Sequence, residues 1–275
     1  MKAPRILIKL GGAALDTAHT LEVVTEAITS YRQFGYKVIL VHGGGPAINN
    51  ELRKRGISWE FVGGQRVTTP AMIDVIENTL CGNVNRQLVR HFSNQGLPVL
   101  GISGADRQTL LCTQASQELG LVGKIVQVNS DWIDSILAMP QSPIPVIAPL
   151  GVGHGGESYN INADWAATHL AVALNVDQLV FLTDQPGVLD EEGEIIRLLD
   201  KEGMLNMIDC KVVSGGMLTK TQSVLHALNN GVNSVRVLKA TDSHLAVVNP
   251  LLGTQCMLDF TSLAVPQKDE AYAAV

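Results

Sequence analysis

Short apolar runs that alternate with longer amphipathic stretches constrain the fold of this chain more than any other feature. Six runs have the length of strands and few polar residues, as expected for strands covered on both faces. They lie at residues 5–10, 37–41, 98–103, 145–150, 178–183 and 234–239. Helical patterns occupy residues 19–34, 46–55, 70–95, 162–175 and 215–230. This order predicts an α/β fold in which helices cover a mainly parallel sheet.

The pattern changes between residues 105 and 130. TLLCTQ (109–114) and LVGKIVQV (121–128) are typical of short antiparallel strands, and ESYNIN (157–162) of another short strand. We expect these short strands to form a hairpin region attached to the main sheet. No Pro-rich or Ser-rich linker divides the chain, so we place only a soft division between an N-terminal lobe (1–176) and a C-terminal lobe (177–275). From about residue 264 the chain is expected to be poorly ordered.

The composition disfavours several classes of protein. The chain has 275 residues, 46% of them hydrophobic and 17% charged, which is enough to bury a large core. Its formal net charge of −6 disfavours a general nucleic-acid binder. No apolar run approaches the ~20 residues of a membrane span. The four cysteines are too widely spaced for a zinc motif and are expected to be reduced thiols. We therefore expect a cytoplasmic protein without a nucleic-acid or membrane partner.

Two lysines and three glycine-rich turns point to phosphate chemistry. Lys9 lies in ILIKLGG, Lys220 in SGGMLTK, and VHGGGPA (41–47) brings three glycines to the start of a helix. Such turns offer backbone N–H groups to anionic oxygens, and a helix N-terminus favours an anion. Strand alternation gives Lys9 no obvious surface face, and a charge at the end of a buried strand needs a partner. We interpret this combination as a small-molecule kinase, because phosphoryl transfer needs positioning and charge neutralisation.

Two familiar nucleotide motifs do not fit. The G-x-x-x-x-G-K-[ST] loop is absent from the sequence. Gly151, Gly153 and Gly156 form a G-x-G-x-x-G after a strand, but ESYNIN follows them and does not open a helix, as a dinucleotide fingerprint requires. We therefore interpret these glycines as a mobile or tight turn.

Polar residues in two further segments have a structural and a functional interpretation. Asn160, Asn162 and Asp164 precede a helix, where they either cap it or hold a substrate and orient the two lysines. Arg66 in GGQRVTT is either a surface arginine or a bidentate ligand for a carboxylate. His42 and His154 lie beside glycine turns without a nucleophile or metal partner in the sequence.

Taken together, the motifs resemble the amino acid kinase family, most closely its members that phosphorylate N-acetyl-L-glutamate. The resemblance runs from about residue 5 to 260 and is specific in the order and spacing of its motifs. They are KLGG (9–12), HGGG (42–45), RVT (66–68), GNVNRQLV (82–89), LVGK (121–124), PVIAPLGV (145–152), YNINAD (159–164), LTDQPGVL (182–189) and GGMLTK (215–220).

The resemblance implies an open three-layer αβα sandwich around a mainly parallel sheet of about eight strands, working as a homodimer. The N-terminal lobe would bind the acylated amino acid and form the dimer, and the C-terminal lobe would bind ATP. The reaction would transfer the γ-phosphoryl group of ATP to the γ-carboxylate of N-acetyl-L-glutamate, the second step of arginine biosynthesis. Mg²⁺ would enter with ATP, held mainly by phosphates and water, and the γ-carboxylate needs no base because it is already ionised at neutral pH.

The resemblance also assigns roles to single residues. Lys9 and Lys220 would neutralise the transferring phosphoryl group from two sides, and Asp164 would orient both lysines. N–H groups would come from Gly11, Gly12, Gly44 and Gly45, the last two also lining the substrate site. Arg66 and Asn160 would hold the substrate α-carboxylate and the neighbouring amide, with Asn162 close by. The nucleotide site would consist of Thr183, Asp184, Gly215, Gly216 and Met217 together with Lys9, Gly11, Gly12 and Lys220.

The chain departs from the family pattern at Gln65, Gln185 and Thr219, which affects the expected affinity or acyl selectivity. It starts almost at its first strand, and SHLAVVNPLLGTQCML (243–258) matches only partly the C-terminal signature of arginine-inhibited members. We therefore expect a dimer in preference to an arginine-inhibited hexamer. Two alternatives stay open: a kinase for another substrate of the family, such as a carrier-protein-linked aminoadipate, and a non-catalytic nucleotide- or oxyanion-binding protein on the same fold.

Overall fold

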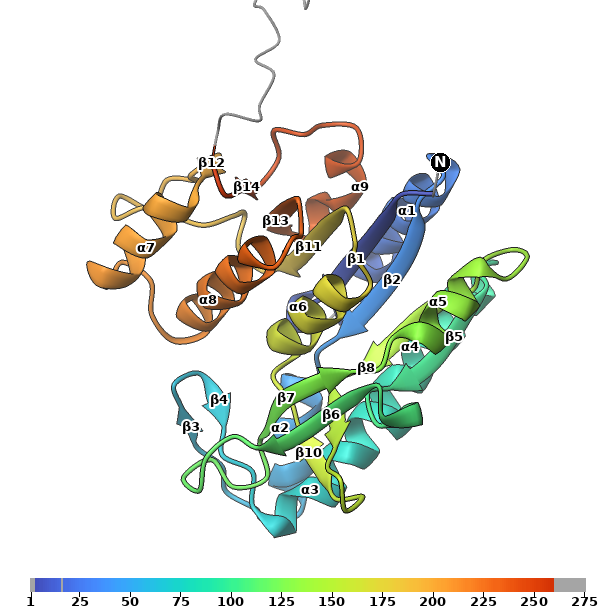
Figure 1. The fold of residues 1–275 in the computed structure, drawn as a ribbon, viewed down its shortest axis with the longest axis vertical. Coiled ribbons are helices and arrows are strands. Elements are labelled where there is room, and N and C mark those ends of the chain that lie inside the picture. The colour runs from blue at the N-terminus through green and yellow to red at the C-terminus, as the bar shows by residue number, and fades with distance from the viewer. Residues whose placement is uncertain (1–2, 16, 260–275) are drawn as a thin grey trace, which may run out of the picture.

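An eight-stranded sheet forms the middle layer of the protein (Figure 1). The computed structural model describes residues 3–15 and 17–259. The strand order is β12-β14-β13-β11-β1-β2-β8-β5, and every neighbouring pair is parallel except β13 and β14. The strands are β1 (Arg5–Leu10), β2 (Lys37–His42), β5 (Val99–Ser103), β8 (Ile144–Ala148), β11 (Gln178–Thr183), β12 (Leu198–Leu199), β13 (Ser234–Lys239) and β14 (Thr254–Cys256).

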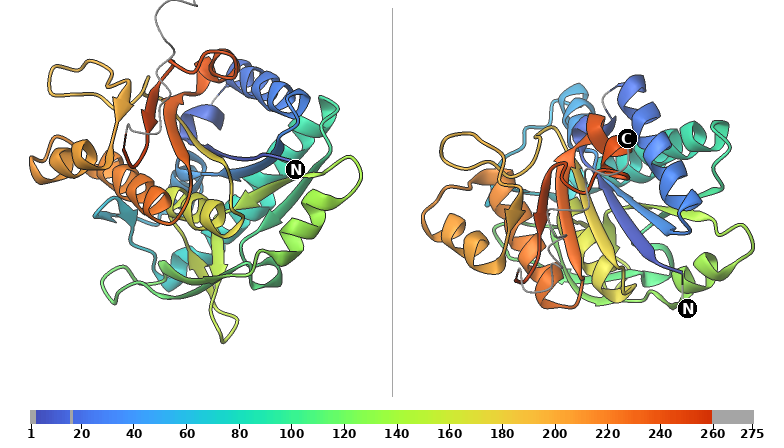
Figure 2. Two further views of the ribbon diagram at one scale, coloured as in Figure 1. Left: turned by 45° about the horizontal axis from the view of Figure 1, so that its top comes forward. Right: turned by 90° about the horizontal axis from the view of Figure 1, so that it is seen from above.

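Helices cover both faces of this sheet, which confirms the predicted three-layer sandwich (Figure 2). One face packs against α5 (Asp131–Ala138), α6 (Ala163–Ala173), α7 (Lys201–Asp209) and α8 (Gly215–Asn229). The other packs against α1 (Ala18–Gln33), α4 (Asn85–Asn94) and α9 (Ser243–Ala246). The helices α5, α7 and α9 and the strands β12 and β14 had no counterpart among the elements predicted from sequence.

Side-chain alternation along β1 decides where Lys9 points. Ile6, Ile8 and Leu10 belong to the core under α1 and α4, whereas Leu7 belongs to the core under α6 and α8. Since successive side chains of a strand face opposite sides of the sheet, Lys9 shares the face of Leu7. The lysine therefore points towards the helices α6 and α8.

Two predicted elements are divided in the structure. The run at 145–150 is broken by Pro149, which has no N–H for a sheet hydrogen bond, and the chain leaves β8 to form β9 (Leu150–Val152) of another sheet. The predicted helix 70–95 consists of α3 (Pro70–Glu77), a π-helical segment (Asn78–Val84) and α4. Gly82 lies within that π-helical segment, where its backbone freedom weakens the α-helical alternative.

Smaller sheets lie at the carboxyl end of the main sheet. The strands β6 (Leu110–Gln114) and β7 (Gly123–Val128) pair antiparallel as predicted, in a four-stranded sheet with β9 and β10 (Ser158–Asn160). The strands β9 and β10 form a hairpin through the G-x-G-x-x-G glycines, so this motif opens no helix, as the sequence predicted. A second hairpin consists of β3 (Phe61–Val62) and β4 (Gln65–Arg66), and α2 (Gly45–Lys54) follows the HGGG turn.

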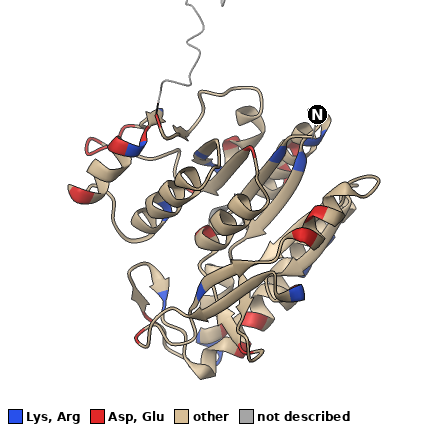
Figure 3. Ribbon diagram, in the orientation of Figure 1, with Lys and Arg blue, Asp and Glu red and all other residues tan. Residues whose placement is uncertain are grey.

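Charged residues are distributed over the whole fold. Figure 3 shows Lys and Arg segments interspersed with Asp and Glu segments on both sides of the central sheet. Within residues 3–15 and 17–259, no helix combines the length and the apolar character that crossing a membrane requires. The expectation for the chain from about residue 264 onward falls outside the described residues.

Candidate active site

Three buried charges from distant parts of the chain meet at the carboxyl end of β1. Lys9 Nζ lies 2.7 Å from Asp164 Oδ1, and Lys220 Nζ donates a 2.9 Å hydrogen bond to Asp164 Oδ2. Asp164 is in the first turn of α6 and Lys220 is in the second turn of α8. Each of the three residues is less than 10% exposed. The group carries two positive charges and one negative charge, so a buried excess of positive charge is available to an anion.

Both neighbours shape the titration of Asp164. Burial by itself raises the pKa of this carboxyl, but the ammonium groups of Lys220 and Lys9 outweigh burial and hold the pKa below its usual range. Burial also lowers the pKa of Lys220, and the charge of Asp164 opposes that shift. The Lys220 ammonium lies 4.9 Å from the ring centre of Phe181, which adds a cation–π contact. Asp164 is therefore ionised at neutral pH and fixes both ammonium groups.

The HGGG turn brings free N–H groups close to these charges. Gly44 is the N-cap of α2 and Gly45 its first residue, so neither N–H has a partner within the helix. Pro46 occupies the next position, where its missing N–H costs nothing. His42 is fully buried and receives a hydrogen bond from Asn85, and burial lowers its pKa to about 4. The turn is thus held by a neutral histidine and presents its N–H groups to the cavity.

Gly11 differs from the expectation that its N–H would bind a phosphate. This N–H already donates to Leu182 O at 3.0 Å, in the continuation of the β1–β11 pairing. A Cβ at Gly11 would lie 2.6 Å from Leu182 O, whereas a Cβ at Gly12 would meet only Pro46 carbons at 3.4 Å. Gly11 is therefore required for the close approach of two backbones.

The substitution Gly11→Ala is expected to lower the free energy of unfolding by about 1–3 kcal/mol, the usual cost of overpacking. The reason is the short distance between the new Cβ and a backbone oxygen that cannot move without opening β1 from β11. Urea unfolding measures the change. Gly12→Ala is the matched control, and equal stabilities of the two variants would contradict this account.

Three side chains hold the Arg66 guanidinium, and its buried Nη1 is left without a hydrogen bond among the described residues. Its Nη2 donates to Asn49 Oδ1 at 2.6 Å, and its guanidinium lies 4.7 Å from the ring centre of Phe61 and 5.7 Å from that of Trp59. The Nη1 atom is buried and has no hydrogen-bond partner among the described residues. Burial lowers the pKa of Arg66. A buried, unpartnered guanidinium nitrogen beside a cavity is suited to a carboxylate ligand.

The two asparagines that precede α6 have different tasks. Asn160 Nδ2 donates to Thr68 Oγ1 at 3.0 Å, which leaves the amide oxygen of Asn160 available. Asn162 is the N-cap of α6, where its Oδ1 accepts from the N–H groups of Asp164 and Trp165. The structure thus answers the question left open by the sequence: Asn162 caps the helix, and Asp164 pairs with the two lysines.

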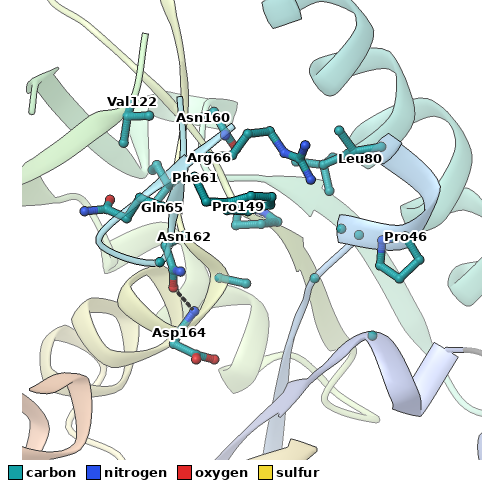
Figure 4. Close-up of a pocket in the computed structure, with 18 of the residues that line it drawn as sticks. Pro46, Phe61, Gln65, Arg66, Leu80, Val122, Pro149, Asn160, Asn162 and Asp164 are labelled. Atoms are coloured by element: carbon teal, nitrogen blue, oxygen red, sulfur yellow. Dashed lines mark hydrogen bonds between the residues drawn. The ribbon is translucent and has the colours of Figure 1, made fainter. Parts of the chain in front are cut away.

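These groups surround one cavity of about 250 Å³ (Figure 4). The predicted residues that line it are Lys9, Gly12, Gly44, Gly45, Arg66, Asn160, Asn162 and Asp164. Figure 4 shows the Arg66 guanidinium extending towards Leu80 on one side, with Gln65 and Val122 on the other. Lys220 does not line the cavity itself, but its ammonium group donates to Asp164, which does.

Of the predicted nucleotide residues, Lys9 and Gly12 line this cavity, whereas the lining does not include Gly11, Thr183, Asp184, Gly215, Gly216, Met217 or Lys220. Thr183 ends β11 and donates to Asp184 Oδ1 at 2.9 Å, and the charge of Asp184 weakly opposes the lowering of the Lys220 pKa by burial. Gly215, Gly216 and Met217 form the first turn of α8, the helix that carries Lys220. Thr183 and Asp184 therefore lie at the end of β11, and the other three residues lie at the start of the helix that carries Lys220.

Sequence reasoning missed the residues that hold Arg66 and Asn160: Asn49, Trp59, Phe61 and Thr68. Thr68 lies in the RVT motif (66–68) but was assigned no role, Asn49 lies outside any motif, and Trp59 and Phe61 give only the weak signal of aromatic residues near a turn. Thr219, one of the departures from the family pattern, donates weakly to Gly63 O at 3.3 Å and thereby joins α8 to the turn of the β3–β4 hairpin.

In this αβα sandwich, two buried lysines that share Asp164 lie with glycine N–H groups at the carboxyl end of the parallel strands. This arrangement is typical of an enzyme that transfers phosphoryl groups. The chain belongs to the amino acid kinase family, whose family model matches residues 4–239.

Relatives of known name cover most of the chain. An acetylglutamate kinase of Ruegeria pomeroyi is 41% identical over 85% of this chain and 80% of that protein. An acetylglutamate kinase of Bacillus cytotoxicus is 36% identical over 90% of this chain and 94% of that protein. Among solved structures, smu.665 of Streptococcus mutans has a TM-score of 0.81 and 27% identity, over 93% of this chain and 99% of that one.

Proposed function

We propose that the protein catalyses the ATP-dependent phosphorylation of the γ-carboxylate of N-acetyl-L-glutamate, the second step of arginine biosynthesis. The observation that carries the proposal is a single cavity lined by Lys9, Asp164 and Arg66, in which Asp164 also pairs with Lys220 and Arg66 has a buried Nη1 without a hydrogen-bond partner among the described residues. The cavity offers the buried charges to the reacting phosphoryl group. It offers the Arg66 guanidinium to the α-carboxylate of the substrate, which does not react. The named relatives support this substrate.

The substrate is bound by its α-carboxylate on Arg66 and by its amide near Asn160. Its γ-carboxylate oxygen attacks the γ-phosphorus in line, the bond from this phosphorus to the bridging oxygen of ATP breaks, and ADP leaves with the bond electrons. No base is required because the attacking carboxylate is already ionised. Lys9, Lys220 and the N–H groups of Gly12, Gly44 and Gly45 stabilise the charge on the transferring group. The product is an acyl phosphate.

ATP binds as its Mg²⁺ complex on the side of Thr183, Asp184 and the first turn of α8. The described residues contain no cluster of three or more metal-ligating side chains, and both oxygens of Asp164 face lysines. This donor set suits a Mg²⁺ ion that keeps its phosphate and water ligands, as Mg²⁺ commonly does in kinases. The nucleotide site then belongs to the C-terminal lobe (177–275) and the acid site to the N-terminal lobe (1–176).

Trapping of the product with hydroxylamine tests the proposal. Pure protein is incubated with Mg-ATP and N-acetyl-L-glutamate, and parallel tubes contain glutamate, aspartate or N-acetyl-aminoadipate. Hydroxamate from N-acetyl-L-glutamate alone is the expected result. Absence of hydroxamate with every acid, despite measurable ATP binding, would favour the carrier-linked substrate or the non-catalytic alternative.

The substitution Arg66→Lys is expected to raise the KM for N-acetyl-L-glutamate by about 10- to 100-fold, while the KM for ATP changes little. A lysine cannot replace two guanidinium hydrogen bonds at once, and a hydrogen bond to a charged group contributes about 1.5–3 kcal/mol. Arg53→Lys is the matched control, since Arg53 also stacks on Trp59 but is exposed. An unchanged KM for the acid would contradict the assignment.

The protein is also proposed to be a cytoplasmic homodimer. Support for the dimer comes from β5, one of the two edge strands of the central sheet, whose Leu100 is 40% exposed. An apolar edge strand is a common pairing surface. Light scattering of the purified protein gives the mass, and a mass of one chain at micromolar concentration would contradict the dimer.

A further inference from the structure

A second cavity adjoins the substrate cavity, and we propose that it is an extension of the site for the N-acyl group. The enzyme then accepts N-acyl-L-glutamates whose acyl chain is longer than acetyl and ends in a carboxylate, with N-succinyl-L-glutamate as the probe. This inference rests on the proposed function, because it assumes that an N-acylated glutamate is phosphorylated.

The second cavity lies between the N-terminal part of the chain and the helices α6 and α8. Its volume is about 480 Å³, and it shares three lining residues, Gln65, Ile161 and Asn162, with the substrate cavity. The remaining wall comes from the segment 115–125, from Trp165 and His169 of α6, and from Gln222 and His226 of α8. The three shared residues therefore form the partition between the two spaces.

The direction of the acyl group follows from the other two contacts of the substrate. The α-carboxylate binds Arg66, whose guanidinium extends towards Leu80. The γ-carboxylate points to the glycine turn and Lys9. The third substituent of the substrate Cα is the acylated nitrogen. With the other two substituents placed, this nitrogen points to the cavity wall on the side away from Leu80, where Figure 4 shows Gln65 and Val122. An acyl chain longer than acetyl on this course meets the partition.

Gln65 is the movable member of the partition. Ile161 is buried, and Asn162 is fixed by two hydrogen bonds as the cap of α6. Gln65 is half-buried, its side chain makes no hydrogen bond with the described residues, and its unbranched chain has several staggered rotamers. A change of rotamer at Gln65 joins the two cavities without moving the backbone.

The lining of the second cavity matches a chain with a negative end. Leu119, Ile125, Ile161 and Trp165 offer apolar surface to methylene groups. Burial lowers the pKa of His169 to about 4 and also lowers that of His226, so both rings are neutral at pH 7. Lys124 then supplies the positive charge, and no Asp or Glu is among the described residues of this lining. Lys124 makes no ion pair within residues 3–15 and 17–259.

Three substrates of matched design test the inference: N-acetyl-, N-butyryl- and N-succinyl-L-glutamate. The butyryl chain has the carbon count of the succinyl chain but no distal charge. We expect the wild-type enzyme to phosphorylate all three, with kcat/KM for the succinyl compound about tenfold above that for the butyryl compound, corresponding to one ion pair of about 1.4 kcal/mol.

The substitution Lys124→Gln is expected to remove this tenfold advantage, mainly through the KM for the succinyl compound. Activity with N-acetyl-L-glutamate stays within twofold. Lys54→Gln is the control for a general loss of positive charge, because Lys54 is exposed and pairs with Glu51 on α2. Lys54→Gln is expected to leave kcat/KM unchanged for all three substrates.

Two results would overturn the inference while the proposed function stands: turnover of the acetyl substrate without either longer one, or an equal loss on all three substrates in Lys124→Gln. Absence of turnover with N-acetyl-L-glutamate itself would instead refute the proposed function, and the inference with it.

Discussion

Replacement of Lys9 by alanine is expected to lower kcat by about 10²- to 10³-fold or more, the usual scale for one preorganised group that stabilises a transition-state charge. The ammonium group is held at 2.7 Å from Asp164 by a buried ion pair within the protein, so its position is preorganised for the reaction. Lys220→Ala is expected to cause a loss of the same size, because Lys220 occupies the other oxygen of the same carboxylate. Steady-state release of ADP measures both variants.

The split between kcat and KM separates this role from simple binding of ATP. A group that acts in the transition state lowers kcat and kcat/KM together, whereas uniform binding raises KM alone. Lys54→Ala serves as the control, since its side chain is 59% exposed. A loss of less than tenfold in either active-site variant, with the fold intact, would remove that lysine from the proposed mechanism.

The position of Lys9 shows how far sequence reasoning could go. The sequence predicted that a lysine inside a buried strand needs a partner, but the alternation along this apolar strand did not indicate which face of the sheet Lys9 occupies. The partner itself, Asp164, was named because the chain resembles the amino acid kinase family, and the local sequence left capping equally open. Only the packed structure shows that Asn162 takes the cap and frees Asp164.

The surroundings of Arg66 were not predictable in the same way. Asn49, Trp59 and Phe61 contact its guanidinium from α2, from the segment after α2 and from β3. A two-residue strand such as β3 has no period to detect, and its position depends on packing against elements distant in sequence. The break at Pro149 is different, because the missing N–H was visible in the sequence and the run 145–150 was still predicted as one strand.

The substitution Asp164→Asn is expected to reduce both activity and stability. The amide keeps the volume of the carboxylate but leaves two buried ammonium groups without a counter-charge, and loss of one partner from a buried pair costs about 3–5 kcal/mol. The loss of kcat is expected to equal or exceed that of either lysine variant, because both lysines lose their fixed position. Urea unfolding at pH 7 measures the stability, with Asp74→Asn on the exposed side of α3 as the control.

The pH dependence distinguishes a lost ion pair from a general packing defect. The pKa of Asp164 is lower in the folded protein than in the unfolded chain, so its stabilising contribution is present above the unfolded value of about 3.9 and disappears as the pH falls below it. The stability difference between wild type and Asp164→Asn should therefore be constant from pH 5 to 7 and narrow below pH 4. The stability difference should also narrow at alkaline pH. In Asp164→Asn the pKa of Lys220 loses the raising effect of Asp164, so the buried lysine of the variant is deprotonated at a lower pH and its unpaired charge disappears. A difference that stays the same across this range would show that the amide disturbs packing, and the two lysines would then not depend on the charge of Asp164.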